Sequence, residues 1–349
     1  MWKENGQIKS KHRGEQSVVF ENPVYVVGRG AVGGQMEKEG PLSAYFDVLA
    51  PDALWGEDTF EKAERKLFLE AAKKALENAH LGMKDMDMLL GGDLLSQIIS
   101  SGFAARELNI PFLGIYGACS SMAEGLALSA MLVDGGFARR AVCAISSHFA
   151  AAERQFRYPL ELGTPKPPTA QHTATAAGAC VVSSRKVRPD DPTVTAATVG
   201  KVVDLGISDA NNMGAAMAPA AADTILTHLE DMAVGPEYYD LIVTGDLGTF
   251  GSELLLKLAA DYGVDLSRNH FDCGKVLYKG VKGVNCGASG CGCGASVLCG
   301  YLLTLMRSGK LGRILFVATG ALLSPTSSLQ GESIPCIAHA VSLERGSAE

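Results

Sequence analysis

The residue whose surroundings point most clearly to chemistry in this sequence is Cys119. It follows a short apolar run, residues 112–116, whose length and composition predict a buried strand. Gly117 permits a sharp turn directly before the cysteine. Residues 122–133 are good helix formers with apolar side chains on nearly every face, which predicts a buried helix. Cys119 is therefore expected at the junction of a strand and a buried helix.

A cysteine at such a junction can serve two kinds of site. Free backbone N–H groups and the positive end of the helix dipole favour a thiolate, but they favour a bound carboxylate equally. Ser120 and Ser121 offer hydroxyl groups at the same helix start. The junction is therefore predicted to be either a nucleophile site or a carboxylate-binding site.

Composition narrows the class of protein. The chain has 349 residues, of which 47% are apolar and 20% charged, with 40 glycines, as is typical of a well-packed α/β protein. The formal net charge of −7 gives no basic field for nucleic acid. The nine cysteines are an odd number in mostly apolar surroundings, which indicates a reducing cytosol. Cys291 and Cys293 lack the paired spacing of a zinc site, so no metal site is predicted.

Two features bear on membranes. Residues 1–17 are polar and lack the apolar stretch of a signal peptide. No apolar run in the sequence is long enough to span a bilayer. Any association with a membrane is therefore expected to be peripheral.

The chain repeats one pattern. The segment DMLLGGDL at residues 87–94 returns as DLIVTGDL at residues 240–247, and each follows an amphipathic helix. Residues 131–146 return as residues 304–320, and each copy comprises a helix end, a turn and an apolar strand. Two such strand and helix units are expected to pack against each other through their central helices.

The repeat predicts a flexible N-terminus at residues 1–17, a first half at residues 18–205 and a second half at residues 206–349. A strand at residues 193–206 is expected to close the first half. Residues 28–42, which contain five glycines and a Glu-Lys-Glu cluster, are expected to form a surface loop.

A cysteine at the start of a buried central helix, in a duplicated α/β chain, resembles the thiolase superfamily, which includes the ketoacyl synthases. Within it the chain is more similar to the stage V sporulation protein AD family of endospore-forming bacteria. The matching stretches span residues 18–343 and include IPFLGIYGACSSM at 110–122, SSHFAAAERQFRYP at 146–159 and DLGISDANNMGAAMAPAAADTI at 204–225. The resemblance implies a duplicated, five-layer α-β-α-β-α fold of the thiolase-like type.

The resemblance also implies a function in sporulation. It implies a non-catalytic binding protein for dipicolinic acid (pyridine-2,6-dicarboxylate), free or as its calcium complex, that is needed for uptake of this acid into the developing spore. The implied partners are the membrane proteins of the same stage V sporulation A operon and a second copy of the chain. The implied location is the cytoplasm of the mother cell or forespore, peripherally at the spore inner membrane, and no cofactor is expected.

Two departures from the superfamily motifs count against catalysis. Condensing enzymes need the cysteine together with two histidines or a His/Asn pair. At one expected histidine position the chain has Gly245 and Asp246, and in GCGCGAS, which resembles the thiolase motif GHPxGAS, Cys291 replaces the other histidine. His270 and His339 remain, so a cysteine-dependent condensing or acyl-transfer enzyme stays the alternative. A scaffold with a vestigial pocket is a third possibility.

A planar dianion requires N–H donors, hydroxyl groups and cations, and calcium adds a requirement for carboxylates. The predicted ligand-binding residues are Cys119, Ser120, Ser121, His148, Arg154, Arg157, Lys201, Asp93, Asp246 and His339.

Structural explanations stay open for several of these residues. The Cys119 thiol is also compatible with simple packing, and His148 with a core histidine that bonds the backbone. Arg154 and Arg157 have Glu153 and Glu161 nearby as partners on a solvated loop.

Overall fold

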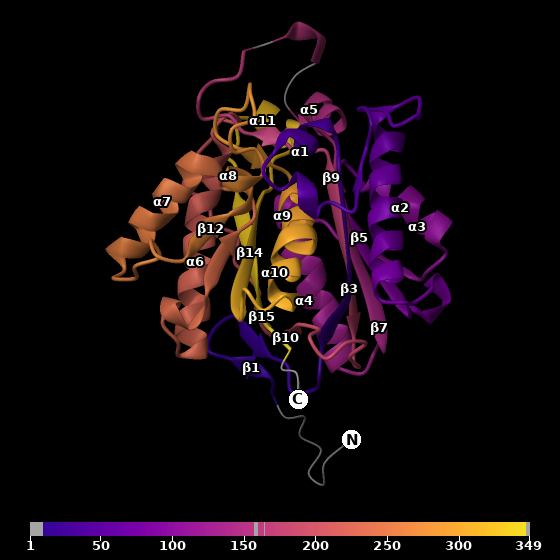
Figure 1. Cartoon of the computed structure of the whole chain (residues 1–349). Helices are drawn as coiled ribbons and strands as arrows, with labels where there is room; N and C mark the ends of the chain where they lie inside the picture. Colours follow the sequence, from indigo (N-terminus) through magenta and orange to yellow (C-terminus); the bar gives the residue numbers. More distant parts are fainter. Residues whose placement is uncertain (1–9, 157–159, 164, 347–349) are drawn as a thin grey trace.

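Helices and sheets alternate across the molecule in five layers (Figure 1). This computed structural model describes residues 10–156, 160–163 and 165–346. Two sheets enclose a central layer of helices, and further helices cover the outer face of each sheet. The five-layer α-β-α-β-α arrangement expected from the resemblance is confirmed.

Within the described residues, each of the two sheets is built on a path of five strands. The path of the first sheet contains, in order, β3 (Tyr25–Gly33), β9 (Ala176–Ser183), β7 (Arg140–Ser147), β5 (Met88–Gly92) and β6 (Phe112–Gly114). The path of the second contains β10 (Thr193–Thr198), β15 (Cys336–Glu344), β14 (Arg313–Ala321), β11 (Leu241–Thr244) and β12 (His270–Asp272). Along both paths the first two neighbouring pairs are antiparallel and the last two are parallel.

The strand order confirms the internal repeat. The paired sequences DMLLGGDL and DLIVTGDL form β5 and β11, which are each fourth along their path. The second pair of matching segments supplies β7 and β14, which are each third. However, β10 does not close the first half as expected, because it pairs with β15 along most of its length and meets β3 at one residue pair, Tyr25 and Thr193.

Seven helices of the described chain make up the three helical layers. The outer layer of the first half contains α2 (Phe60–Asn78) and α3 (Ile99–Leu108), and that of the second half contains α6 (Met213–Met232) and α7 (Gly248–Asp261). The central layer contains α4 (Ser121–Asp134), α9 (Cys291–Val297) and α10 (Leu303–Arg307), the last two joined by a π-helical segment, Leu298–Leu302. Helix α4 contacts strands of both sheets, which explains why small apolar residues occupy nearly every face of it.

Short elements connect these layers. The helices are α1 (Gln35–Glu39), α5 (Phe149–Phe156), α8 (Cys273–Leu277) and α11 (Pro325–Leu329). The strands are β1 (His12–Arg13), β2 (Ser17–Val19), β4 (Val48–Leu49), β8 (His172–Thr173) and β13 (Ala288–Ser289).

Three apolar clusters hold the layers together. The largest lies at the centre and includes Met122 and Leu126 of α4 together with Phe316 of β14. A second cluster fills the space between the first sheet and α2, around Phe68. A third cluster fills the corresponding space below α6, around Ile225. Each sheet is therefore buried on both faces, as its nearly continuous apolar strands require.

The expectation of a flexible N-terminus through residue 17 is wrong for residues 10–17. The carboxylate of Asp231, at the end of α6, accepts hydrogen bonds from the backbone N–H groups of Glu15, Gln16 and Ser17. Strand β2 then pairs with β10 of the second sheet. The terminal segment thus binds to the second half before the chain enters the first, a contact that no local pattern in residues 1–17 indicates.

The predicted surface loop at residues 28–42 is also wrong. Most of its first part is β3, a central strand of the first sheet. Glu37 is fully buried, and its carboxylate accepts hydrogen bonds from the N–H groups of Gly34 and Thr175 and from the Tyr278 hydroxyl. The glycines permit close packing: a Cβ at Gly30 would lie 2.2 Å from the backbone oxygen of Ala71 in α2.

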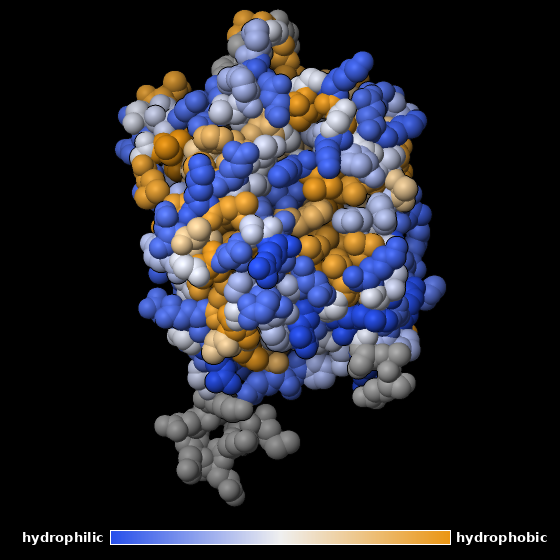
Figure 2. All heavy atoms as spheres, turned by 60° about the vertical axis from the view of Figure 1, so that its left-hand side comes forward, coloured by the Kyte–Doolittle hydropathy of each residue, from blue (hydrophilic) through white to orange (hydrophobic). Residues whose placement is uncertain are grey.

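On the face of the molecule in Figure 2, which brings the side formed by α6 and α7 forward, hydrophobic areas alternate with hydrophilic ones. Among the helices of the described residues, none combines the length and the apolar character needed to cross a bilayer.

Candidate functional site

The turn before α4 has an unusual backbone. Ala118 adopts a left-handed conformation with φ of 50°, at a short 3₁₀ turn, Ala118–Ser120. Gly320 of β14 packs directly against this turn, because a Cβ at that position would lie 2.1 Å from the carbonyl oxygen of Gly117. The turn holds Cys119 at the start of α4, as the sequence predicts.

A pocket opens at this turn, at the end of the molecule where α5 and α11 lie in Figure 1. The space between its walls, including the open mouth, is about 540 Å³. The lining is mostly apolar and is contributed by both halves. The lining residues are Leu94, Tyr116, Ala118, Cys119, Ala152, Glu153, Phe156, Thr173, Met213, Met217, Asp246, Ser289, Gly290, Ala321 and Leu323.

Asp246 lines the pocket together with Cys119 and has the strongest bearing on the chemistry of the thiol. Its carboxyl group accepts hydrogen bonds from the Thr319 hydroxyl (2.8 Å) and from the backbone N–H of Gly290 (2.9 Å). The Cys119 thiol also interacts with this carboxyl group. Burial raises the pKa of Asp246 to about 7. Burial, followed by the negative charge of Asp246, raises the pKa of the Cys119 thiol well above its usual range.

The residue that replaces the second superfamily histidine is turned away from the pocket. Cys291 is fully buried, and its thiol donates to the backbone oxygen of Ser146 (2.9 Å). Burial raises the pKa of Cys291 well above that of a free thiol. Among the pocket-lining residues that the structure describes, none is a histidine.

A second carboxylate lies on the opposite wall. Glu153 of α5 is 4% exposed and accepts a hydrogen bond from the Thr173 hydroxyl (3.0 Å). The ammonium group of Lys166 lies 3.5 Å from the same carboxylate oxygen and 4.7 Å from the centre of the Phe149 ring. Glu153 therefore lines the pocket and contacts a lysine, whereas its place in the sequence indicates only a surface partner for arginine.

Three predicted ligand groups are used by the fold itself. The Ser120 hydroxyl donates to the backbone oxygen of Gly117, and the Ser121 hydroxyl donates to that of Ala118, so neither lines the pocket. The Asp93 carboxylate accepts from the Leu95 N–H and from the N–H and hydroxyl of Ser101, behind the pocket wall. These groups shape the site without facing it.

The two predicted histidines also lie outside the lining. His148 is 1% exposed and bonds the backbone oxygen of Ala53 through Nε2 (2.8 Å), while its Nδ1 accepts from the N–H of Ala150. Burial lowers the pKa of His148, which matches the alternative of a neutral core histidine. His339 lies on β15, accepts from the N–H of Gly200, and has its pKa lowered to about 4 by burial.

The predicted cations are likewise engaged elsewhere. Arg154 pairs with Glu61 (2.7 Å) and not with Glu153. Lys201 is exposed and lies 3.8 Å from Glu15 and 3.9 Å from Asp223, on the surface away from the pocket. Arg157 lies outside the described residues.

Of the ten predicted residues, the structure thus brings Cys119 and Asp246 together in one pocket. The lining residues that sequence reasoning missed include Glu153, Thr173, Met213 and Met217. Glu153 falls within one of the matching stretches and next to Arg154, but no spacing relates it to Cys119. Met213 and Met217 are four residues apart at the start of α6, a spacing that places both on one helix face but does not indicate a pocket.

Among the described residues there is no group of three His, Cys, Asp or Glu side chains placed to hold a metal ion. The pocket instead offers two separate carboxylates, hydroxyl groups and apolar walls. Such a lining suits a small, flat ligand that brings its own charge compensation.

Solved structures with the same architecture share little sequence with the chain. A variant of OleA from Xanthomonas campestris matches with a TM-score of 0.60 and 15% identity, covering 94% of this chain and 100% of that one. The 3-oxoacyl-(acyl-carrier-protein) synthase III from Aquifex aeolicus matches with a TM-score of 0.56 and 14% identity, covering 92% and 99%. The chain is therefore an α/β protein with the thiolase-like fold.

Sequence comparison is more specific. The chain is 48% identical over 335 residues to stage V sporulation protein AD from Bacillus subtilis (strain 168), covering 96% of this chain and 98% of that protein. The model of the family described as Stage V sporulation protein AD matches residues 14–344. The chain belongs to the stage V sporulation protein AD family, a family of sporulation proteins.

Proposed function

We propose that the chain is a non-catalytic binding protein for dipicolinic acid, free or as its calcium complex, that serves uptake of the acid into the developing spore. The observation that carries this proposal is the carboxyl group of Asp246 beside Cys119, in a pocket where the superfamily enzymes need a base. A thiol next to a carboxylate stays protonated at neutral pH, and a protonated thiol is a poor nucleophile. The protein thus has a formed pocket but a poorly nucleophilic thiol, and this combination supports ligand binding over acyl transfer.

The apolar walls support a flat aromatic ligand. Met213 and Met217 line one side of the pocket and Phe156 and Leu94 contribute further apolar surface. Thioether sulfur makes favourable contacts with aromatic rings, and methionine adapts to a ring's shape. If the pyridine ring packs among these side chains, the two carboxylates of the ligand can contact the polar groups of the lining.

The charges of the pocket support the calcium complex over the free dianion. Among the described lining residues, Glu153 and Asp246 are acidic and none is basic. Lys166 compensates part of the Glu153 charge, but a free dianion would still meet Glu153, and Asp246 when ionised, unfavourably. Calcium takes six to eight oxygen ligands, and a bound dicarboxylate would supply several of them. Glu153, and Asp246 when ionised, would then attract the complex.

Calorimetric titration of the purified chain with dipicolinic acid, with and without calcium, tests the proposal. We expect saturable binding that is tighter with calcium. Glu153→Gln should abolish most of the calcium-dependent gain, about tenfold in Kd, because it removes a negative charge and a carboxylate oxygen of the kind that calcium takes as a ligand. Cys119→Ala should also change the affinity, since Cys119 lines the pocket.

Lys201→Ala is the matched control, because Lys201 is exposed and lies away from the pocket. Its titration curve should match that of the unmodified chain. Absence of heat at millimolar ligand, in the presence of calcium, would reject the proposal.

The alternative is a condensing or acyl-transfer enzyme, and one observation favours it: Cys119 is accessible from the pocket at a helix start, in a fold shared with an enzyme named as a synthase. Incubation with acyl-CoA followed by intact-mass measurement separates the two. A covalent acyl group that disappears in Cys119→Ala would establish the enzyme. If the protein is only a scaffold, cells that carry pocket variants should sporulate normally.

We also propose that the chain forms a homodimer and is held peripherally at the spore inner membrane together with the membrane proteins of the same operon. The open edge of β6 supports the first part, since it ends the first sheet with apolar side chains around it. Lack of a membrane-crossing helix in the described residues is compatible with the second part.

A further inference from the structure

A basic surface with exposed apolar side chains lies at the end of the molecule opposite the pocket. It is formed by the turn that precedes β7 and by the loop that links β9 to β10. We call it the basic end, and it consists of Phe137, Arg139, Arg140, Arg185, Lys186, Val187 and Arg188. In Figure 1, α5 and α11 mark the pocket end at the top, and β1 and the start of β7 lie at the bottom.

The two segments are adjacent in space. Arg140 pairs with Ser183 at the start of the β7 and β9 ladder. Just beyond it, the N–H of Ser184 donates to the backbone oxygen of Arg139 (3.1 Å). Arg139 and Ser184 are in contact although they are 45 residues apart in the sequence. The segments FARRA and SRKVR, which contain them, therefore form one continuous surface.

Large apolar side chains protrude from this surface. Phe137 is 74% exposed and Val187 is 41% exposed. The Phe137 ring lies against the backbone of Gly135. This contact requires glycine, because a Cβ there would come within 2.9 Å of the ring. An exposed aromatic ring among arginine and lysine side chains is a typical feature of surfaces that meet lipid headgroups.

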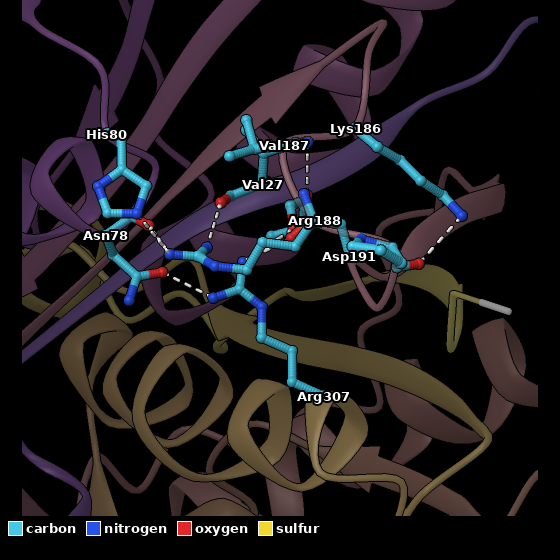
Figure 3. Close-up of polar contacts among 10 residues, drawn as sticks. Val27, Asn78, His80, Lys186, Val187, Arg188, Asp191 and Arg307 are labelled. Carbon is cyan, nitrogen blue, oxygen red and sulfur yellow. Dashed lines mark hydrogen bonds and ion pairs between the residues drawn. The ribbon is translucent and has the colours of Figure 1, made fainter. Parts of the chain in front are cut away.

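The loop that presents Lys186 and Val187 is held by buried polar contacts (Figure 3). The Asp191 carboxylate, which is fully buried, accepts from the N–H groups of Val187 and Arg188 (both 2.8 Å). Arg307 of α10 donates to the same carboxylate (3.0 Å) and to the Asn78 side chain (2.6 Å). The loop is therefore preformed, and docking through it would require little additional ordering.

The positive charge of the basic end is only partly compensated. Arg139 pairs with Asp87 (2.7 Å). Within the described part of the chain, Arg185 and Lys186 pair with no carboxylate, and the Lys186 ammonium donates to the backbone oxygen of Pro189. The chain as a whole has a formal net charge of −7, so this concentration of positive charge is a local feature. It is complementary to an anionic surface.

We propose that the basic end docks the protein on a bilayer of anionic phospholipid, with Phe137 and Val187 at the level of the headgroups. The proposal builds on the proposed peripheral location and does not depend on which ligand the pocket binds. Strand β7 spans eight residues between the two ends, or about 26 Å, so the pocket would face away from the lipid.

Co-sedimentation of the full chain with vesicles tests the proposal. Vesicles of phosphatidylglycerol and phosphatidylcholine should bind the chain, and vesicles of phosphatidylcholine alone should not. The charge reversal Arg185→Glu with Lys186→Glu should weaken binding at least tenfold, since each basic residue near an anionic surface contributes about fivefold. Phe137→Ser should weaken it less, and high salt should weaken it strongly.

The matched control is Lys257→Glu with Lys282→Glu, which changes the net charge equally at exposed positions on α7 and after α8, away from the basic end. It should bind like the unmodified chain. Equal binding by the two charge-reversal variants, or equal binding to neutral vesicles, would overturn the proposal. Binding to polyglutamate that requires Arg185 and Lys186, without vesicle binding, would overturn it in favour of an acidic protein partner.

Ligand calorimetry on the same variants separates this proposal from the proposed function. The basic end lies away from the pocket, so the reversal of Arg185 and Lys186 should leave dipicolinic acid titration unchanged. Vesicle binding without ligand binding, or the converse, would then reject one proposal and leave the other standing.

Discussion

At the scale of single residues, the chemistry of the pocket depends on which charge faces Cys119. A histidine there would share a proton with the thiol and favour the thiolate. Asp246 acts in the opposite direction, because above its pKa of about 7 it places a negative charge beside the sulfur. One carboxyl group therefore both suppresses the nucleophile and provides an oxygen that suits a cation.

Substituting Asp246→Asn should make Cys119 more reactive. Removing the negative charge lowers the pKa of the thiol, so the midpoint of the pH profile for alkylation by iodoacetamide should move to lower pH. Modification at Cys119 is followed by peptide mass spectrometry, because the chain has nine cysteines. Asp204→Asn, at an exposed position, is the control. An unchanged midpoint would mean that burial alone controls the thiol.

The sequence predicts Cys119 and Asp246 because each lies directly after a strand within a recognisable motif. It does not predict Glu153, which lines the pocket, or Lys166, which pairs with it, because both positions depend on tertiary packing. It also assigns His148 and Arg154 to the ligand, although local partners, Ala53 and Glu61, occupy them. Residue type indicates what a side chain can bind, but only the tertiary arrangement decides what it does bind.

At the scale of elements, the position of Cys119 depends on contact between a turn and a strand. The turn that contains Ala118 lies against β14, and the absence of a side chain at Gly320 permits this contact. This close approach joins the cysteine of the first half to the second sheet. The pocket therefore depends on the packing of the two halves.

Gly320→Ala tests this dependence. The added methyl group would lie 2.1 Å from the backbone oxygen of Gly117, so the strand or the turn must move. We expect a loss of about 1–3 kcal/mol in the free energy of unfolding, the usual range for overpacking, measured by denaturant titration. Gly102→Ala in α3 is the control, because nothing lies within 4 Å of its Cβ position, and alanine there should be neutral or slightly stabilising. Equal stability of both variants would show that the turn adjusts freely.

The sequence predicts whether a segment is a helix or a strand better than it predicts which elements lie next to it. Helix α4 begins and ends close to the predicted residues, because its composition is apolar on nearly every face. The predicted strand at residues 112–116 forms only over β6, Phe112–Gly114, and its predicted burial is wrong: Leu113 is 48% exposed, because β6 ends the sheet. Whether an apolar strand is central or at an edge depends on strand order, which a local pattern does not contain.

At the scale of the whole molecule, the two halves use one topology for different tasks. Both sheets end in a short parallel strand, β6 in the first and β12 in the second. Around β6 the exposed side chains are large and apolar: Ile99 and Phe103 of α3 are 45% and 47% exposed, close to the value for Leu113. An open strand edge bordered by such side chains is a site for pairing with another chain. A second copy of the chain would offer the same edge, and pairing through it would give the symmetric, closed homodimer proposed above.

Leu113→Arg should therefore weaken the proposed homodimer. A buried, unpaired charge at the centre of an interface is costly, so the dissociation constant of the dimer should rise more than tenfold in sedimentation velocity experiments. Leu329→Arg is the control, because Leu329 is 90% exposed on α11, at the pocket end of the molecule, and its substitution should leave the dimer unchanged. If the unmodified chain sediments as a monomer at high micromolar concentration, the open edge of β6 serves another partner and the homodimer is rejected. If both variants weaken the dimer equally, the loss is not specific to the β6 edge, and this edge is rejected as the dimer interface.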